Sequence, residues 1–452
     1  MTKTILKYVC QNCGTISHKW LGRCPDCESW NSFTEEYLPE TNKMISKLQD
    51  KTETSSLDKI ITPDNIRYST KISEFDRVIG GGIVLGSSIL IGGEPGIGKS
   101  TLALQIGGAL ARDNLKILYI SGEESPSQLK TRAERLNLIS SNIYISPHTD
   151  YYNIENDVLN LNPGLIIVDS IQTISHPEIQ SIIGSVSQIK QCSTELIKLT
   201  KTKNIPIIFI GHVTKDGAIA GPRLLEHMVD TVLYFEGDKK QQIRILRSFK
   251  NRFGPTNDIA IWEMKKEGLS EIDNLSTAFI DKNSLNLPGS GLSITLEGMR
   301  PFIIEMQALV NPQKSSFPPR RNFTGVDYNR TAMIIAVLEK KGGLYLGGED
   351  IFINIVGGIK INEPSIDLSL AAAICSSFKN KILPKDSIFL GEIGLTGELR
   401  LINQLEKRLI EAEKFGIKKV FMPKNNLDAI NKGISLEINS ISCINELLSM
   451  IF

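Results

Sequence analysis

The chain has 452 residues, with 51 Lys and Arg against 50 Asp and Glu, so its formal net charge is +1. This length is too great for one domain of ordinary size and predicts two or three. A composition of 41 % hydrophobic and 22 % charged residues excludes a disordered, fibrous or polybasic chain. A nucleic-acid partner would require positive charge that is concentrated locally, because the chain as a whole has no basic surplus.

The N-terminal segment lacks the apolar core of a secretory signal, and no apolar run approaches the roughly 18 residues of a membrane span. We therefore expect a cytoplasmic protein with no membrane partner. Of the 7 cysteines, four lie within the first 27 residues. The others, Cys192, Cys375 and Cys443, are far apart in the sequence, which suits a reducing compartment and a role as buried apolar residues.

Changes in composition along the chain predict four segments. Residues 1–33 are rich in Cys and Trp, and residues 34–60 are polar, as in a linker. Residues 61–272 alternate short β-branched runs with helical patterns, which predicts an α/β domain with a parallel sheet. Residues 273–452 mix strand-like and helical segments and predict a separate α+β domain.

Cys10-x-x-Cys13 and Cys24-x-x-Cys27 are two CxxC pairs separated by ten residues. Two such pairs can complete a tetrahedral site of four sulfurs that suits Zn²⁺. A module of about 30 residues has too small a core to fold alone, so the metal would supply much of its folding free energy. Redox or structural cysteines without a metal are the disfavoured alternative. We interpret His18, which lies between the two pairs, as a residue that does not bind the metal.

A phosphate-binding loop is the strongest signal in the chain. Residues 93–100 read GEPGIGKS, which matches GxxxxGK[ST] between a predicted strand and a predicted helix. The glycines let backbone amides face a phosphate, and the start of the helix adds its dipole. The expected nucleotide-binding residues are Gly93, Glu94, Pro95, Gly96, Ile97, Gly98, Lys99, Ser100 and Thr101.

The loop predicts ATP and Mg²⁺ as cofactors. Lys99 would contact the β- and γ-phosphate oxygens, Ser100 would ligate Mg²⁺, and Thr101 would lie near the α-phosphate. Asp169 ends the apolar run LIIVD. Its carboxylate would then hold Mg²⁺ beside Ser100. The alternative for Asp169 is a cap of the next turn.

Two adjacent carboxylates, Glu123 and Glu124, follow the strand-like run KILYI. A carboxylate at the end of a neighbouring strand can orient a water molecule towards the γ-phosphate, and only one of the two can point there. We favour Glu123 as the catalytic partner of Lys99, and the alternative is two solvated turn residues. His212 follows the run IPIIFIG, where a phosphate-sensing role and a plain hydrogen bond to a loop are equally open.

Positive charge is concentrated in a few segments. Residues 239–252, KKQQIRILRSFKNR, contain six basic residues and no acidic ones. Such a cluster can neutralise phosphate on DNA or on a nucleotide of a neighbouring subunit, or it can be a solvated basic strand edge. The further candidates for DNA contact are Lys215, Arg320, Arg321 and Arg330.

Several segments resemble the bacterial RadA (Sms) family, and the resemblance covers essentially the whole chain. They are RCPDCESWNSF, GGEPGIGKST, YISGEES, LIIVDSIQT and the box KNRFG. The resemblance implies a RecA-like ATPase that forms a homo-hexameric ring on single-stranded or branched DNA and drives branch migration. A RecA-type recombinase is the implied partner. The resemblance also implies that the box couples DNA to ATP turnover across the subunit interface, through Lys250, Asn251, Arg252, Phe253 and Gly254.

The C-terminal part resembles the proteolytic domain of Lon. Residues 363–367, EPSID, align with the stretch that bears the nucleophilic serine, and Ser365 is present. The position of the catalytic lysine aligns with Glu406, and the neighbouring Lys407 would point about 100° away around a helix. Asp367 also stands where Lon has glycine. Because a serine without a positioned base is a weak nucleophile, we expect a non-proteolytic scaffold for ring assembly and DNA contact.

Three functions follow as hypotheses. The first is a DNA-stimulated, helicase-like ATPase that processes recombination intermediates in DNA repair. The second is an ATP-dependent protease that uses Ser365. The third is a RecA-fold signalling scaffold that cycles nucleotide slowly and binds a protein.

Overall fold

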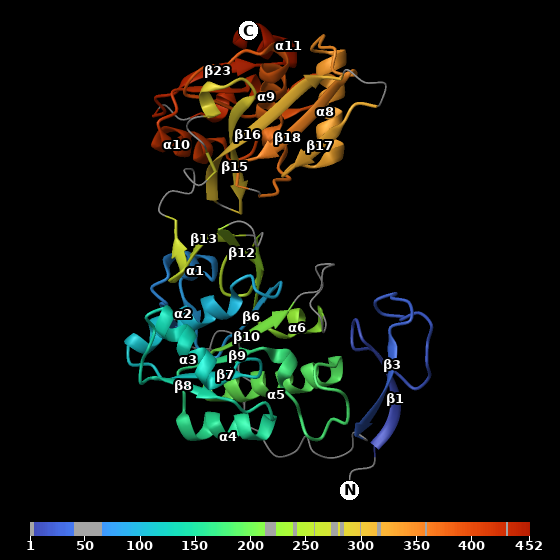
Figure 1. Ribbon diagram of the computed structural model, residues 1–452, viewed down its shortest axis with the longest axis vertical. Helices are drawn as coiled ribbons and strands as arrows, with labels where there is room; N and C mark the ends of the chain where they lie inside the picture. The colour runs from blue at the N-terminus through green and yellow to red at the C-terminus, as the bar shows by residue number, and fades with distance from the viewer. Residues whose placement is uncertain are drawn as a thin grey trace, which may run out of the picture. The chain divides into compact units, whose positions relative to one another are not determined.

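The computed structural model divides the chain into two compact units, residues 1–271 and 272–452 (Figure 1). The described residues are 4–39, 66–212, 223–237, 242–256, 258–272, 279–280, 284–298, 300–313, 318–357, 359–430 and 433–452. Each unit has its own sheets and hydrophobic core. None of the described helices combines the length and apolar character that a bilayer-spanning segment needs.

The N-terminal module is a small antiparallel sheet in the order β2 (Ile16–Ser17), β1 (Thr4–Cys10) and β3 (Phe33–Pro39). β1 and β3 pair along their whole length. The prediction that residues 34–39 belong to a linker is therefore wrong. Their polar composition reflects a sheet of only three strands, which buries little of its surface. Backbone pairing with β1 holds residues 34–39, while Phe33 at the start of β3 packs in the core.

Cysteine makes up much of the core of this module. Its buried and packed residues are Tyr8, Cys10, Cys13, Cys24, Cys27 and Phe33. The four sulfur atoms all lie within 4.8 Å of one another, with 3.6 Å between Cys10 and Cys27 and 3.5 Å between Cys13 and Cys24. Zinc–sulfur bonds of about 2.3 Å put tetrahedral sulfurs about 3.8 Å apart, so the four thiols fit one zinc ion with little movement.

The remainder of the first unit is built on a nine-stranded sheet in the order β14-β13-β12-β11-β6-β10-β9-β7-β8. Its parallel strands are β6 (Ser88–Gly93), β7 (Ile117–Ser121), β8 (Ile143–Ser146), β9 (Leu165–Asp169), β10 (Ile207–His212) and β11 (Thr231–Glu236). Three antiparallel strands extend one edge: β12 (Ile243–Asn251), β13 (Ile259–Lys265) and β14 (Gly268–Glu271). The predicted α/β fold with a parallel sheet is confirmed.

Helices cover both faces of this sheet. One core contains apolar residues of α1 (Ser73–Val78), α2 (Lys99–Arg112) and α3 (Pro126–Arg135). The other contains residues of α4 (Tyr151–Leu161), α5 (Val186–Lys203) and α6 (Arg223–Met228). Successive residues of β6 alternate between the two cores, as in a strand that is buried on both faces.

The second unit has an α+β fold. A four-stranded sheet has the order β15 (Ser290–Glu297), β16 (Arg300–Pro312), β18 (Glu349–Ile355) and β17 (Arg321–Thr324). Three parallel strands, β19 (Ser387–Phe389), β22 (Lys419–Pro423) and β23 (Glu437–Ile441), form a second sheet, and β20 (Glu392–Ile393) pairs with β21 (Leu399–Arg400). The helices are α8 (Tyr328–Lys340), α9 (Asp367–Lys379), α10 (Leu405–Phe415) and α11 (Ile444–Ile451).

A buried ion pair joins α8 to the start of α9. The Asp367 carboxylate is 1 % exposed, and Arg330 donates to its two oxygens at 2.8 and 2.5 Å. The backbone N–H of Ile393 donates to the same carboxylate at 3.0 Å. The sequence had offered Arg330 as a DNA contact, but its guanidinium is held by Asp367 inside the unit, so that prediction is corrected.

We expect Arg330→Ala to lower the free energy of unfolding by about 3–5 kcal/mol, because it leaves the buried Asp367 carboxylate without its bidentate partner. Arg330→Lys should restore part of the loss, since lysine supplies the charge without the planar fork. Urea unfolding of the full-length protein measures both. Arg320→Ala is the matched control, because that exposed side chain should contribute less than about 0.5 kcal/mol. An unchanged unfolding midpoint in Arg330→Ala would contradict the assignment.

The joint substitution of Cys13 and Cys27 by Ser should abolish zinc binding and unfold the N-terminal module, because two of the four sulfurs are lost. Zinc content should fall from about one ion per chain to near zero in metal analysis. Cys443→Ser, in the second unit, is the control and should keep its zinc. Full zinc occupancy in the double variant would refute the four-sulfur site.

Candidate nucleotide-binding and hydrolysis site

The phosphate-binding loop, residues 93–100, connects β6 to α2 near the middle of the parallel strands. In the register of the sheet, His212 of β10 is level with the start of the loop, and Ser121 of β7 is level with Asp169 of β9. The carboxyl ends of these parallel strands meet at one edge, which is where ligands bind in open α/β sheets. The loop, His212, Asp169 and Glu123, two residues beyond β7, therefore gather at the same edge.

Two glycines give the loop its shape. Gly96 and Gly98 have φ angles of +79° and +122°, in the region that favours glycine. A Cβ atom on Gly98 would lie 2.6 Å from Met264 Cε and 3.2 Å from Phe235 Cε1. Because α2 begins directly afterwards, at Lys99, the first N–H groups of the helix are directed at the loop, as in an anion-binding site.

Lys99 is buried inside this loop, with 3 % of the residue exposed. Its ammonium group donates to the carbonyl oxygens of Gly93 and Glu94, both at 2.8 Å. The Nδ1 atom of His212 lies 3.2 Å from the same ammonium group. Lys99 therefore lies within the phosphate-binding loop, and its contact with the β- and γ-phosphates stays a prediction.

Glu123 faces Lys99 across the imidazole of His212. Its Oε1 atom accepts a hydrogen bond from the Ser170 hydroxyl at 2.6 Å and lies 2.9 Å from His212 Nε2. Chiefly through the hydrogen bond from His212, the pKa of Glu123 falls to about 2, so the carboxylate is ionised at neutral pH. The Glu124 carboxylate instead pairs with Arg132 of α3 at 2.5 Å. Only Glu123 of the adjacent pair therefore joins this cluster.

Asp169 ends β9 at the same edge of the sheet and is 6 % exposed. Its Oδ2 atom accepts a hydrogen bond from the Tyr119 hydroxyl at 2.6 Å. Burial and the neighbouring carboxylate raise the pKa of Tyr119, which keeps that hydroxyl protonated as a donor. Asp169 and Ser100 offer a carboxylate and a hydroxyl oxygen, the ligand types that Mg²⁺ prefers.

Lys250, in the KNRFG box, caps a helix. Its ammonium group donates to the carbonyls of Glu226, His227 and Val229 at 2.8, 3.2 and 2.7 Å, where α6 ends. Burial lowers the pKa of Lys250, and the nearby Arg252 adds to this effect. A cation at the carboxyl end of a helix satisfies its last carbonyls. Lys250 is thus not part of a solvated basic edge.

Arg252 is the exposed cation of the box, with 56 % of its side chain exposed. Its Nη1 atom lies 3.3 Å from Asp230 Oδ1. The other oxygen of Asp230 accepts from the N–H and the hydroxyl of Ser88, at 3.1 and 2.7 Å. Ser88 opens β6 and the phosphate-binding loop follows its other end, so Arg252 lies roughly 16 Å along the strand from its own loop.

Asn251, Phe253 and Gly254 shape the backbone of the box. Asn251 Oδ1 accepts from the Phe253 N–H at 3.0 Å and from the Thr231 hydroxyl at 3.2 Å. A Cβ atom on Gly254 would lie 2.7 Å from the Cα atom of Gly80. The close approach of these two backbones requires glycine.

The other predicted DNA contacts differ in their surroundings. Lys215 lies outside the described residues. Arg320 is exposed, whereas Arg321 donates to the carbonyl of Leu346 at 2.9 Å and is therefore partly engaged.

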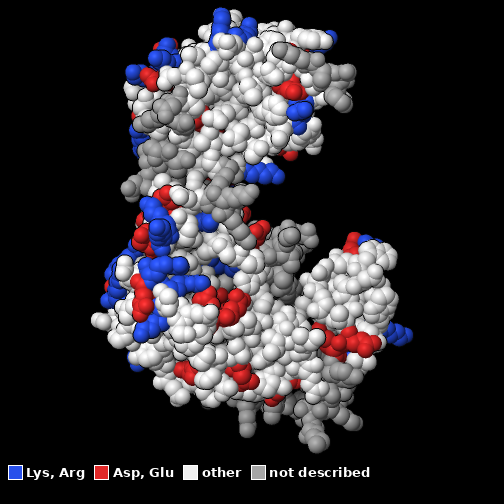
Figure 2. Space-filling view, viewed as in Figure 1, with Lys and Arg blue, Asp and Glu red and all other residues white. Residues whose placement is uncertain are grey.

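Figure 2 shows Lys and Arg side chains gathered over the part of the first unit that carries α1, α2 and α3. The sequence analysis missed this group, although Lys130, Arg132 and Arg135 fall within a single helix.

The Lon-like serine faces an arginine. Ser365 is 4 % exposed, and its hydroxyl lies 3.1 Å from the Nη1 atom of the fully buried Arg408. Arg408 also donates to the carbonyl of Ile294 at 2.5 Å and pairs with Glu363. The alignment had put Glu406 at the base position, but the residue that contacts Ser365 is Arg408. A guanidinium stays protonated in proteins and cannot accept the serine proton.

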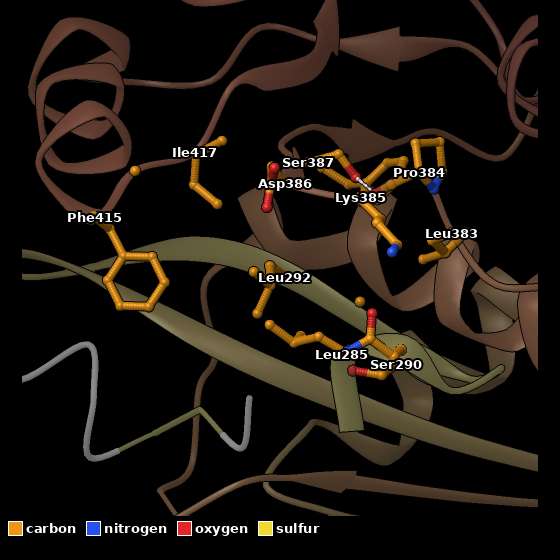
Figure 3. A pocket seen from close by; sticks show the side chains of 14 residues that line it. Leu285, Ser290, Leu292, Leu383, Pro384, Lys385, Asp386, Ser387, Phe415 and Ile417 are labelled. Atoms are coloured by element: carbon orange, nitrogen blue, oxygen red, sulfur yellow. Dashed lines mark hydrogen bonds between the residues drawn. The ribbon is translucent and has the colours of Figure 1, made fainter. Parts of the chain in front are cut away.

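A cavity of about 300 Å³ lies in the second unit, between β15 and the segment that follows α9 (Figure 3). Leu285, Leu292 and Phe415 form apolar walls, while Lys385 and Asp386 are its charged lining residues. The described residues of the phosphate-binding loop do not line it. The cavity adds no group to the hydrolysis site.

Three family profiles match parts of the chain. Residues 8–35 match a rubredoxin metal binding domain, which agrees with the four-sulfur zinc site. Residues 68–144, which include the phosphate-binding loop, match the KaiC ATPase family. Residues 329–426 match the ChlI subunit of Mg-chelatase.

Full-length relatives are similar across all of these regions. The DNA repair protein RadA of Bacillus subtilis is 45 % identical over 99 % of both chains. The DNA repair protein RadA of Streptococcus pyogenes serotype M1 is 46 % identical over 100 % of both chains. A crystal structure of the RadB recombinase aligns with 45 % of this chain and 99 % of its own at 24 % identity, with a TM-score of 0.37, too low to support an argument.

The identity of these relatives over the whole chain confirms the resemblance to RadA, and the KaiC match agrees with a P-loop ATPase site. The chain belongs to the RadA family of DNA repair proteins.

Proposed function

We propose that this protein is a DNA-dependent ATPase motor that drives branch migration of recombination intermediates. The observation that carries the proposal is the cluster of Lys99, His212 and Glu123 at the phosphate-binding edge of the sheet. Lys99 and the loop amides bind the phosphates of ATP, and Glu123 orients the attacking water molecule. Ser100 and Asp169 hold Mg²⁺, which when bound neutralises phosphate charge.

The ionised Glu123 carboxylate fits an orienting role. A group whose pKa is about 2 is a weak proton acceptor, but it accepts a hydrogen bond from water at any neutral pH. Phosphoryl transfer depends mainly on positioning and electrostatic stabilisation, so an oriented water molecule and the Lys99 ammonium supply what the reaction needs.

We infer that the active form is a homo-hexameric ring on single-stranded or branched DNA, acting in the cytoplasm with a RecA-type recombinase. Family membership supports this, since the relatives are named DNA repair proteins. The exposed Arg252 also supports this form. Because Arg252 lies far from the phosphate-binding loop of its own chain, it is available to bind DNA or the nucleotide of a neighbouring subunit. The box thereby couples DNA to ATP turnover.

We further propose that residues 273–452 are a non-proteolytic domain for ring assembly and DNA contact. The contact between Ser365 and Arg408 supports this over an ATP-dependent protease. A signalling scaffold would hydrolyse ATP slowly without regard to DNA. The ATPase rate with and without single-stranded and branched DNA separates that function from the motor, because only a motor should be stimulated.

Glu123→Gln should lower kcat for ATP by about 100-fold or more while ATP still binds, because it removes the carboxylate that orients the water molecule. Lys99→Ala should abolish hydrolysis and weaken nucleotide binding. Steady-state ATPase assays and binding of a fluorescent ATP analogue measure the two effects. Glu124→Gln is the matched control and should stay within about threefold of the wild type, since its carboxylate pairs with Arg132. A normal kcat in Glu123→Gln would exclude the assignment.

Arg252→Ala should remove the stimulation of ATPase by DNA while the basal rate and nucleotide affinity change little. The exposed guanidinium interacts with Asp230 only at 3.3 Å, so its loss should not unfold the sheet. ATPase assays at several salt concentrations, with and without single-stranded DNA, test this. Lys250→Ala makes a useful contrast, because loss of the α6 cap should also lower the unfolding temperature. Full DNA stimulation in Arg252→Ala would refute the coupling role.

A further inference from the structure

The phosphate-binding loop rests on side chains of the strands that extend the sheet beyond β6. The Nε–H of Arg244, on β12, donates to the carbonyl oxygen of Ile97 at 2.9 Å. The next residue of the loop, Gly98, lies against Phe235 of β11 and Met264 of β13, where a Cβ atom would be 3.2 and 2.6 Å from their side chains. Arg244 thus supplies a polar contact to the loop, which the sequence motif of the loop does not reveal.

Arg244 is held in a fixed orientation. The residue is 6 % exposed, and its Nη1 atom also donates to the carbonyl oxygen of Ile243 at 2.9 Å. The backbone of Gly237 lies next to the side chain, because a Cβ atom there would be 3.2 Å from Arg244 Cδ and 3.5 Å from Nη1. A guanidinium stays protonated in proteins and has only donors, so Arg244 offers the loop a permanent donor.

The bond from Arg244 sets the orientation of one peptide group of the loop. The carbonyl of Ile97 and the N–H of Gly98 belong to the same trans peptide group, in which they point in opposite directions. Because the carbonyl is directed at Arg244, the N–H of Gly98 is directed away from β12.

The two residues that flank this peptide group differ in conformational freedom. The Ile97 side chain is 1 % exposed and packs in the core of the first unit, so the Cα atom of Ile97 is held. Gly98 has a φ angle of +122°, and a glycine adopts φ angles of either sign at little cost. The peptide group can therefore turn over without moving the core, which would exchange the directions of its N–H and its carbonyl. Arg244 opposes this rotation because it binds the carbonyl.

We propose that Arg244 is a positioning residue for nucleotide binding, which holds the peptide group between Ile97 and Gly98 so that the Gly98 N–H faces the β-phosphate. The inference rests on the proposed binding of ATP at this loop. A carbonyl oxygen turned towards the phosphate would repel it. The apparent affinity for nucleotide therefore scales with the fraction of molecules in the orientation that Arg244 selects. ADP and ATP depend on Arg244 alike, because both carry a β-phosphate.

The test compares Arg244→Gln with Arg244→Met in the full-length protein. Glutamine places its amide nitrogen at the same position along the side chain as Nε of arginine, so it keeps a donor to Ile97, whereas methionine has a similar length and no donor. We expect the Kd for ADP, measured by calorimetry, to rise about 10- to 100-fold in Arg244→Met and less than about fivefold in Arg244→Gln. Equal weakening in the two variants would overturn the proposal, since it would point to the charge or the fold instead of the donor.

The kinetic signature separates this role from a general loss of structure. At saturating ATP, bound nucleotide selects the productive orientation, so kcat in Arg244→Met should stay within about threefold of the wild type while KM rises. The control is Lys265→Met on β13, whose ammonium group is half exposed and pairs with Glu263 at 3.1 Å. Its Kd for ADP should stay within about twofold of the wild type. A loss confined to kcat in Arg244→Met would contradict the proposal.

A crystal structure of the wild-type protein with ADP supplies a measurement that no variant's folding can obscure. It should show the Gly98 N–H within hydrogen-bond distance of a β-phosphate oxygen and the Ile97 carbonyl still bound to Arg244. An Ile97 carbonyl that has turned away from Arg244 in this complex would overturn the proposal.

Lys99→Ala, assayed for ADP binding in parallel, separates the two claims. If Lys99→Ala binds ADP as tightly as the wild type, the proposed nucleotide site fails. If Lys99→Ala loses ADP while Arg244→Met keeps the wild-type Kd, only the positioning role of Arg244 fails.

Discussion

The carboxyl ends of β6, β10, β9 and β7 lie side by side, and the chemistry of the first unit depends on that register. The strands deliver, in this order, the loop with Lys99, His212, Asp169 and, just beyond β7, Glu123. They are buried on both faces, so a slip of one residue would turn each core side chain to the wrong face. The apolar pattern that fixes the register therefore also fixes the distances between the polar groups.

Strand β6 also connects the hydrolysis site to the KNRFG box. The phosphate-binding loop follows its carboxyl end, while Ser88 at its amino end binds Asp230, the partner of Arg252. A displacement of the KNRFG box therefore acts on β6, the strand that also holds the phosphate-binding loop. Rigid packed strands can carry small displacements from one site to another.

Two arginines, the partly exposed Arg330 and the fully buried Arg408, organise the second unit. Arg330 anchors α8 to Asp367, and Arg408 of α10 contacts Ser365, Glu363 and the backbone of β15. Each guanidinium satisfies several acceptors at once, which offsets the cost of burying its charge. The group that contacts the Ser365 hydroxyl is therefore a permanent donor, which also helps to hold this part of the second unit together.

Local spacing in the sequence determined the zinc ligands, the phosphate-binding loop and the parallel sheet, because CxxC pairs, GxxxxGK[ST] and short β-branched runs impose their geometry on neighbouring residues. It did not determine the extent of β3, whose polar residues are held by backbone pairing with β1. Nor did it reveal that Lys250 caps α6, that Arg330 is paired with Asp367 or that His212 bridges Lys99 and Glu123. Those contacts join residues far apart in the chain, and charge or position in sequence cannot say which partner a side chain meets. Only the packing of strands and helices decided which basic side chains bind groups within the protein and which, like Arg252, are exposed.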